Sequence, residues 1–281
     1  MIGDSYKKIQ RTLAVLPAVL LLACGGGGSS SINDDTQAGG GDDGNSGDVQ
    51  GDAGVPGELH DAYLWFDGNV TVALNGNEVT LEATGRPNHT SPYWNPNNAS
   101  GFYVAPDPAI TDEARMSPGY IEDYVNLFTL TVPTSPSLAA TSSTTSLGPV
   151  GIAVSGVPIF NDQEGPNIDL NIGVISGFDR NGAHTGPSTY HYHLEPQAIS
   201  FNDDALIGVM ADGFFLYGRY CYATPGSYPD DLDASGGHFG VTQHSNGLSE
   251  YHYHVKNEPY LGAYYLLFPE DYQGTPNNIS N

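Results

Sequence analysis

The sequence Tyr-His-Tyr-His occurs twice, at residues 190–193 and 251–254, each time followed by an aliphatic residue. Successive side chains on a β-strand point to opposite faces, so each copy places two histidines on one face and two tyrosines on the other. Histidines one residue apart on a strand are separated by about 6–7 Å at the backbone, so their ring nitrogens can converge on one ion. The two segments therefore predict β-strands with one face of imidazoles.

Both copies belong to a longer internal repeat. Residues 151–160 match 208–217, residues 178–186 match 232–240, and residues 190–194 match 251–255. The offsets are 57, 54 and 61 residues, so the blocks keep their order while the loops between them differ in length. This pattern predicts two copies of one β-rich unit, at about 151–194 and 208–255, related by a pseudo-twofold axis.

The rest of the chain favours an all-β (mostly β), sandwich- or barrel-like fold in a single domain at 59–281. Sustained helical periodicity is almost absent, and Gly, Asn, Ser, Thr and Tyr are abundant. A hairpin is expected at 63–73, with Asp-Gly-Asn as its turn, and a second turn is expected at Asn-Gly-Asn before a strand at 78–83. Further strands are expected at 125–132 and 151–159, with a Ser/Thr/Pro-rich loop at 133–148 between them.

The charge of the chain excludes several classes of partner. Lys and Arg number 8 against 32 Asp and Glu, which gives a formal net charge of -24. A phosphate backbone attracts the opposite sign, so no nucleic-acid partner is expected. Adsorption to an anionic membrane surface is excluded for the same reason.

The N-terminal segment has the features of an export signal. Lys7, Lys8 and Arg11 precede an apolar run at 13–23 that is too short to span a bilayer. The run ends Leu-Leu-Ala before Cys24 and resembles the lipobox of bacterial lipoproteins, which implies cleavage after residue 23 and a lipid anchor on Cys24. An ordinary secretory signal is the alternative. Residues 24–58 are then a flexible Gly/Ser/Asp linker, and the protein is expected to be exported and membrane-anchored, in the periplasm or at the cell surface.

A transition-metal ion is the ligand that the histidines indicate. Each unit adds one loop histidine between glycines, giving three imidazoles per unit, which is the donor set of a reactive zinc or copper site. Two separate sites or one shared site both fit this pattern. The candidate ligands are His184, His191, His193, His238, His252 and His254, with His89 as a further candidate.

Other residues are candidates for supporting roles. Asp179 and Asp233 each precede a loop histidine by five residues, as acceptors for an imidazole N–H or as turn residues. Cys221, the only cysteine left beside Cys24, is expected to be a small buried residue, with a thiolate ligand as the alternative. The candidate catalytic residues are Tyr190, Tyr192, Tyr251 and Tyr253.

Three functions stay open from the residues alone. Bound zinc would suit hydrolysis and bound copper would suit redox chemistry. A metal-free protein that acts on or binds an extracellular polysaccharide or a small molecule is the second possibility. A structural or adhesion module, with histidines in hydrogen-bond networks, is the third.

The motifs together resemble the YHYH domain family of secreted proteins. The resemblance extends from about residue 63 to 268 and includes the segments 85–89, 154–161, 211–218 and 236–254. The family commonly carries cysteines just before its Gly-His blocks, whereas Ala234 and Ser235 occupy those positions here. The resemblance therefore implies a domain without implying a reaction.

Overall fold

The structure is a computed structural model that describes residues 55–97, 100–109, 113, 116, 121–122, 127–186, 189–269 and 271–281. The described residues belong to one compact unit. The expected signal peptide, Cys24 and nearly all of the expected linker lie outside the described residues. A search of the described part of the chain finds no helix with the length and apolarity needed to cross a membrane.

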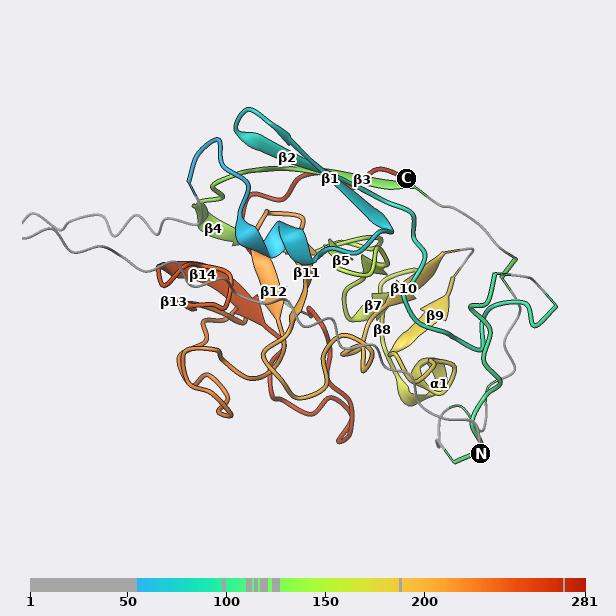
Figure 1. Cartoon of the computed structure of the whole chain (residues 1–281). Helices are drawn as coiled ribbons and strands as arrows, with labels where there is room; N and C mark the ends of the chain where they lie inside the picture. Colours follow the sequence, from blue (N-terminus) through green and yellow to red (C-terminus); the bar gives the residue numbers. More distant parts are fainter. Residues whose placement is uncertain are drawn as a thin grey trace, which may run out of the picture. The chain divides into compact units, whose positions relative to one another are not determined.

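The largest sheet contains eight strands, and its strand order is symmetric about its middle. The second unit contributes β13-β14-β12-β11, and the first unit continues the sheet as β5-β6-β10-β9. In Figure 1 the strands β13 and β14 lie at one end of this sheet and β9 at the other. The strand bounds are β5 Gly151–Ala153, β6 Pro158–Ile159, β9 Ala183–Thr185, β10 Tyr190–Tyr192, β11 Leu206–Met210, β12 Phe215–Tyr217, β13 Gly237–Val241 and β14 Ser249–His254.

The two units meet at the antiparallel pair β5–β11. Ile152 and Val209 are equivalent residues of the repeat, and they lie opposite each other in this pair. A twofold relation between the units requires this register, which agrees with the predicted pseudo-twofold axis. The strands approach closely at Gly208, where a Cβ would lie 2.3 Å from the carbonyl oxygen of Ile152. Only glycine fits there without moving the backbone.

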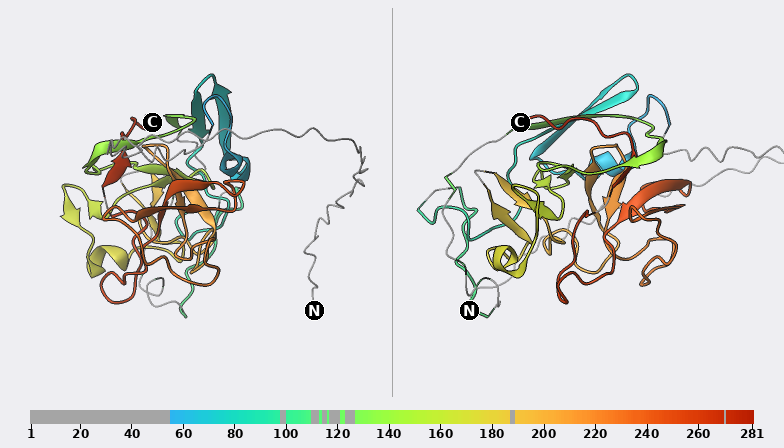
Figure 2. Two further views of the ribbon diagram at one scale, coloured as in Figure 1. Left: turned by 90° about the vertical axis from the view of Figure 1, so that its left-hand side faces the viewer. Right: turned by 180° about the vertical axis from the view of Figure 1, so that it is seen from behind.

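A second, three-stranded sheet covers one face of the large sheet. Its order is β1-β2-β3, with bounds β1 Val70–Asn75, β2 Glu78–Ala83 and β3 Phe128–Pro133. Leu81 and Leu130 from this sheet pack with Ile152 and Val209 in one core cluster. A second cluster, built on the tyrosines of β10 and β14, covers the opposite face. Figure 2 shows the arrangement from two further directions. The all-β expectation is confirmed in its sandwich-like form, and the strands of the described residues form no closed barrel.

Short elements complete the described part of the chain. The α-helix α1 has only four residues and is capped by Asn171, whose side chain accepts from the backbone N–H groups of Gly173 and Val174. The remaining bounds are η1 Asp61–Trp65, β4 Leu138–Ser143, β7 Gln163–Glu164, β8 Ile168–Asp169, α1 Ile172–Ile175 and β15 Tyr272–Gly274.

Two local predictions were wrong. The segment expected as a strand at 63–66 is part of the 3-10 helix η1, because His60 caps it by accepting from the N–H of Ala62. β1 pairs instead with β2 across the second predicted turn, where Gly76 has a φ of 63°. The expected loop at 133–148 contains β4, which pairs with β15 from the end of the chain. A partner so distant in sequence leaves no local signal.

Candidate metal centres

The alternation of Tyr and His separates the two residue types as predicted. All four tyrosines of the motifs are at most 4 % exposed and lie in the core cluster on one face of the sheet. The register of β12 with β14 shows the separation directly. Leu216 of that core lies beside Tyr253, whereas Tyr217, which packs in the opposite cluster, lies beside His254.

The first cluster gathers three predicted histidines and one carboxylate. His184 of β9 lies opposite His191 of β10, and His193 follows at the end of β10. The Nε2 atoms of His191 and His193 are 3.0 Å apart. Glu164 of β7 extends its Oε1 to 2.6 Å from Nε2 of His184 and 3.3 Å from Nε2 of His193.

The second cluster repeats this geometry in the other unit. His238 of β13 lies opposite His252 of β14, and the Nε2 atoms of His252 and His254 are again 3.0 Å apart. Cys221 completes the group, with its Sγ 3.8 Å from Nε2 of His238. The ligand atoms of Cys221, His238 and His254 lie within 4.8 Å of one another, with His252 beside His254, so the histidines form two groups, one per unit, rather than one shared group.

Hydrogen bonds fix the tautomer of both His-x-His pairs. In the first unit Nδ1 of His191 lies 2.9 Å from the carbonyl oxygen of Thr189, and Nδ1 of His193 lies 2.5 Å from that of Asn161. A carbonyl oxygen only accepts, so each Nδ1 carries the proton. Each Nε2 of this pair therefore keeps its lone pair for a ligand.

The second unit holds its histidines by equivalent groups. Nδ1 of His252 donates to the carbonyl oxygen of Glu250 at 3.1 Å, and Nδ1 of His254 donates to that of Gly218 at 2.7 Å. The loop histidine has a carboxylate partner, because Nδ1 of His238 lies 2.7 Å from Oδ1 of Asp231. Partners of this kind orient an imidazole and raise its basicity toward a metal.

Burial keeps the imidazoles of His191, His252 and His254 neutral. His191 is 1 % exposed and His252 is 2 % exposed. Desolvation, followed by the charges of the neighbouring histidines, lowers the pKa of both rings well below the usual value. Desolvation likewise lowers the pKa of His254 to about 4. At neutral pH the 3.0 Å contact between His252 and His254 therefore joins two unprotonated nitrogens rather than a donor and an acceptor.

The donor sets fit a tetrahedral ion. Bonds of about 2.0–2.1 Å place two nitrogen ligands about 3.3 Å apart, and a thiolate sulfur about 3.6 Å from a nitrogen ligand. The first distance is close to the 3.0 Å within each histidine pair, and the second is close to the 3.8 Å from Cys221 to His238. Oε1 of Glu164 and Nε2 of His184 are buried atoms whose contact lacks the geometry of a hydrogen bond. An ion between them would give both atoms a partner.

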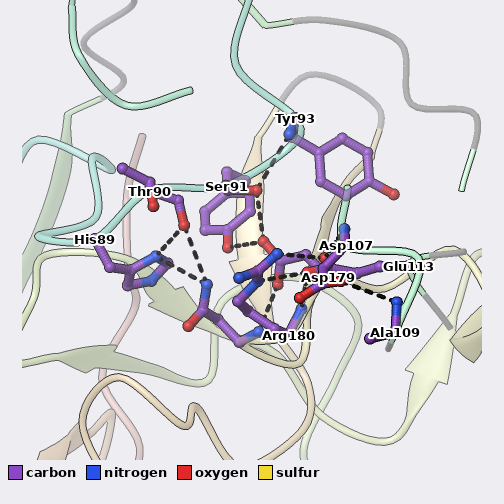
Figure 3. A network of polar contacts seen from close by, with 11 residues as sticks. His89, Thr90, Ser91, Tyr93, Asp107, Ala109, Glu113, Asp179 and Arg180 are labelled. Carbon is purple, nitrogen blue, oxygen red and sulfur yellow. Dashed lines mark hydrogen bonds and ion pairs between the residues drawn. The ribbon is translucent and has the colours of Figure 1, made fainter. Parts of the chain in front are cut away.

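Asp179 and Asp233 serve the tyrosines rather than the imidazoles. Oδ2 of Asp179 accepts from the hydroxyls of Ser91 and Tyr190, and its Oδ1 accepts from the N–H of Asn181. Figure 3 shows this network, with Arg180 and Glu113 beside it. Asp233 accepts from Tyr251 in the same way at 2.7 Å. The turn interpretation of both residues therefore fits, and the expected hydrogen bond to a ligand histidine is replaced by one to a tyrosine.

His89 lies on the tyrosine side of the sheet. Its Nε2 is 2.7 Å from the hydroxyl of Tyr192, and its Nδ1 is 3.0 Å from the amide nitrogen of Asn181. Tyr192 and His193 point to opposite faces of β10, so His89 does not join the first cluster. The structure therefore corrects the expectation that His89 is a further ligand of the metal.

Glu164 was missed from the sequence, and Cys221 was expected as a buried residue, with a thiolate ligand as the alternative. Both follow the first block of the repeat and are related by its offset of 57 residues. Extending the matched blocks 151–160 and 208–217 by four residues aligns Glu164 with Cys221. Because Glu and Cys are chemically different, this alignment indicates a shared role only once the histidines around both residues are known. Cys221 is buried, as expected, and lies among the histidines.

Comparison with known proteins gives one match. A family model described as YHYH protein matches residues 129–228, a narrower span than the expected 63–268. The matched range contains the whole first cluster and Cys221, and it ends before the histidines of the second cluster. Neither a curated protein nor a solved structure matches the chain.

Proposed function

Because residues 129–228 of this chain belong to the YHYH family, and because its duplicated histidines gather in two buried clusters, we propose that each cluster binds one transition-metal ion, copper or zinc. The imidazole nitrogens are the common ligands of both sites. The observation that carries this proposal is the pair of facing Nε2 atoms, 3.0 Å apart, in each unit.

A cation between these nitrogens resolves an otherwise unfavourable contact. Two lone pairs at this distance repel each other, and the carbonyl oxygens that hold each Nδ1 prevent the rings from changing tautomer. A shared proton would also relieve the repulsion, but it would create a buried imidazolium, which the lowered pKa of His191 and of His252 opposes. A metal ion supplies the positive charge and accepts both lone pairs.

The surroundings of the clusters also favour metal binding over a metal-free polysaccharide site. Phe160 stacks on His191 with ring centroids 3.9 Å apart, and Phe178 stacks on His193 at 5.3 Å. In the second unit Tyr217 packs edge-on against His252 at 5.4 Å. Rings enclosed by aromatic side chains and at most 3 % exposed offer no platform to a polymer. An apolar shell of this kind tunes the chemistry of a bound ion.

Metal analysis tests the proposal. The protein is stripped with chelator, incubated with zinc or with copper, desalted and measured for metal per chain. We expect about two ions for the parent, and about one for His193→Ala and for His254→Ala, because each loses one ligand of one cluster. The double variant His193→Ala/His254→Ala should retain almost none.

His89→Ala is the matched control. This histidine is also in contact with a Tyr of the motif, but it lies on the other face of the sheet. Its removal should leave the metal content unchanged. A parent protein that binds less than about a tenth of an ion per chain would exclude the proposal, as would equal metal content in the parent and the double variant.

We further propose that the protein is exported and held at a membrane by a lipid on Cys24. The support is the order of basic residues, apolar run and Leu-Leu-Ala-Cys at the start of the chain. Expression with radiolabelled palmitate should label the parent but not Cys24→Ala. Equal labelling of the two proteins, or no labelling of either, would contradict the anchor.

A further inference from the structure

The two clusters differ at one chemical position. Glu164 and Cys221 are equivalent in the repeat, and each is the one non-histidine ligand candidate of its cluster among the described residues. Their surroundings are matched in detail. Asn161 and Gly218, three residues before them, are also equivalent, and both accept a hydrogen bond from Nδ1 of the last histidine of the motif. The scaffold is thus duplicated, while the fourth donor changes from a carboxylate oxygen to a sulfur.

We infer that the two clusters hold different metal ions: the Cys221 cluster takes copper(I), and the Glu164 cluster takes zinc(II). This inference rests on the proposed function, because it assigns the ions within sites already proposed to bind metal. The change of the non-histidine donor, from the carboxylate of Glu164 to the thiol of Cys221, beside histidines from the same positions of the repeat carries the assignment.

Ligand softness gives the direction of the preference. Thiolate is a soft ligand that copper(I) and zinc both accept, whereas a carboxylate oxygen is a hard ligand that suits divalent ions and disfavours copper(I). Sγ of Cys221 and the nearest nitrogens of His238 and His254 lie within 4.8 Å of one another, so the sulfur is within reach of the same ion as the imidazoles.

The burial of the two clusters also differs in the way that this assignment requires. Cys221, His238, His252 and His254 are all at most 8 % exposed, so the second cluster excludes water and favours an ion of low charge. The side chains of Glu164 and His184 are 27 % and 15 % exposed, so the first cluster lies nearer the surface, although Oε1 of Glu164 and Nε2 of His184 are themselves buried.

Competition between the two metals tests the assignment. The stripped full chain is incubated without oxygen with equal amounts of copper(I) and zinc(II), each buffered by a chelator, and copper and zinc per chain are measured. We expect about one copper and one zinc in the parent. Cys221→Ser should lose the copper, with affinity for copper(I) lowered more than about 100-fold, since loss of even an outer-shell partner costs about 10–100-fold. X-ray absorption at the copper edge should show one sulfur neighbour in the parent.

Exchange of the fourth donor provides the matched variants. Glu164→Cys should bring a second copper into the chain at the expense of zinc, and Cys221→Glu should replace copper by zinc. Far-ultraviolet circular dichroism of each stripped variant confirms that it is folded, and Glu164→Gln serves as the variant that removes charge without adding sulfur.

The outcomes separate the two proposals. A parent that binds neither metal overturns the metal-binding function itself. A parent that binds two ions but shows no sulfur neighbour at copper, or a copper-to-zinc ratio unchanged by Cys221→Ser and by Glu164→Cys, overturns the assignment and leaves metal binding intact.

Discussion

The hydroxyl of Tyr190 donates a hydrogen bond of 2.6 Å to Oδ2 of Asp179, and both residues are buried. The equivalent pair of the second unit, Tyr251 and Asp233, has the same contact at 2.7 Å, but Asp233 is exposed. The tyrosines of the motif thus hold the turns that precede the loop histidines. The two units support their clusters by the same bond in two different environments.

Removal of the Tyr190 hydroxyl should lower the free energy of unfolding more than removal of the Tyr251 hydroxyl. Tyr190→Phe leaves a buried carboxylate short of one donor, which costs about 1.5–3 kcal/mol of the free energy of unfolding. Tyr251→Phe leaves an exposed carboxylate that water can solvate, so its cost should be under about 1 kcal/mol. Urea unfolding of the two variants measures the difference. Equal losses would show that burial of Asp179 does not govern the effect.

The carbonyl of Gly218 should be essential to the second cluster alone. A Cβ at this position would lie 2.2 Å from the carbonyl oxygen of Asp203, so Gly218→Ala must displace the backbone that accepts from His254. We expect the variant to bind about one ion per chain instead of two, because the imidazole loses its orientation. Metal analysis after desalting measures this. Asn161→Ala is the control, since it keeps the equivalent carbonyl at a position that already carries a side chain.

Metal should stabilise the folded protein. At a free concentration about 100 times the dissociation constant, each occupied site adds about 2.7 kcal/mol to the free energy of unfolding. Zinc should therefore raise the melting temperature of the stripped protein, and chelator should reverse the rise. The shift should persist in His89→Ala and vanish in His193→Ala/His254→Ala. A shift of the same size in the double variant would mean that zinc acts elsewhere on this acidic chain.

Asp212 should make the stability depend on pH. Burial raises the pKa of Asp212 to about 6, well above the usual value of an aspartate, even though its carboxylate accepts from the hydroxyl of Tyr253. Between about pH 4 and pH 6 the folded state then binds more protons than the unfolded state. The free energy of unfolding therefore falls as pH rises through this window, by roughly 3 kcal/mol from this group.

Asp212→Asn should remove that part of the slope. The free energy of unfolding of the stripped parent and of stripped Asp212→Asn is measured by urea unfolding from pH 4 to pH 8. The two pH profiles are compared with each other because the other carboxylates titrate in both proteins. Parallel profiles would show that Asp212 keeps an ordinary pKa when folded.

Much of the site followed from local sequence. Alternation of side chains along a strand is a property of the backbone, so Tyr-His-Tyr-His alone separated imidazoles from phenols. The repeat identified His184 and His238 as the third members of their groups, and the structure brings both beside the pairs. By contrast, the acceptors of the imidazole N–H groups are backbone carbonyl oxygens of residues such as Asn161 and Gly218. Every residue has a backbone carbonyl, so the sequence does not indicate which of them accept these hydrogen bonds.

The sequence by itself determined the duplicated unit, the mostly β fold and the three histidines of each cluster, because these depend on periodicity and on matching blocks. Only the tertiary structure decided that the clusters are separate, that Glu164 and Cys221 complete them, and that Asp179 and Asp233 bind tyrosines. These facts depend on the strand order about β5–β11 and on the loops that return to the sheet. Contacts between such distant segments arise from packing in three dimensions, which no local pattern encodes.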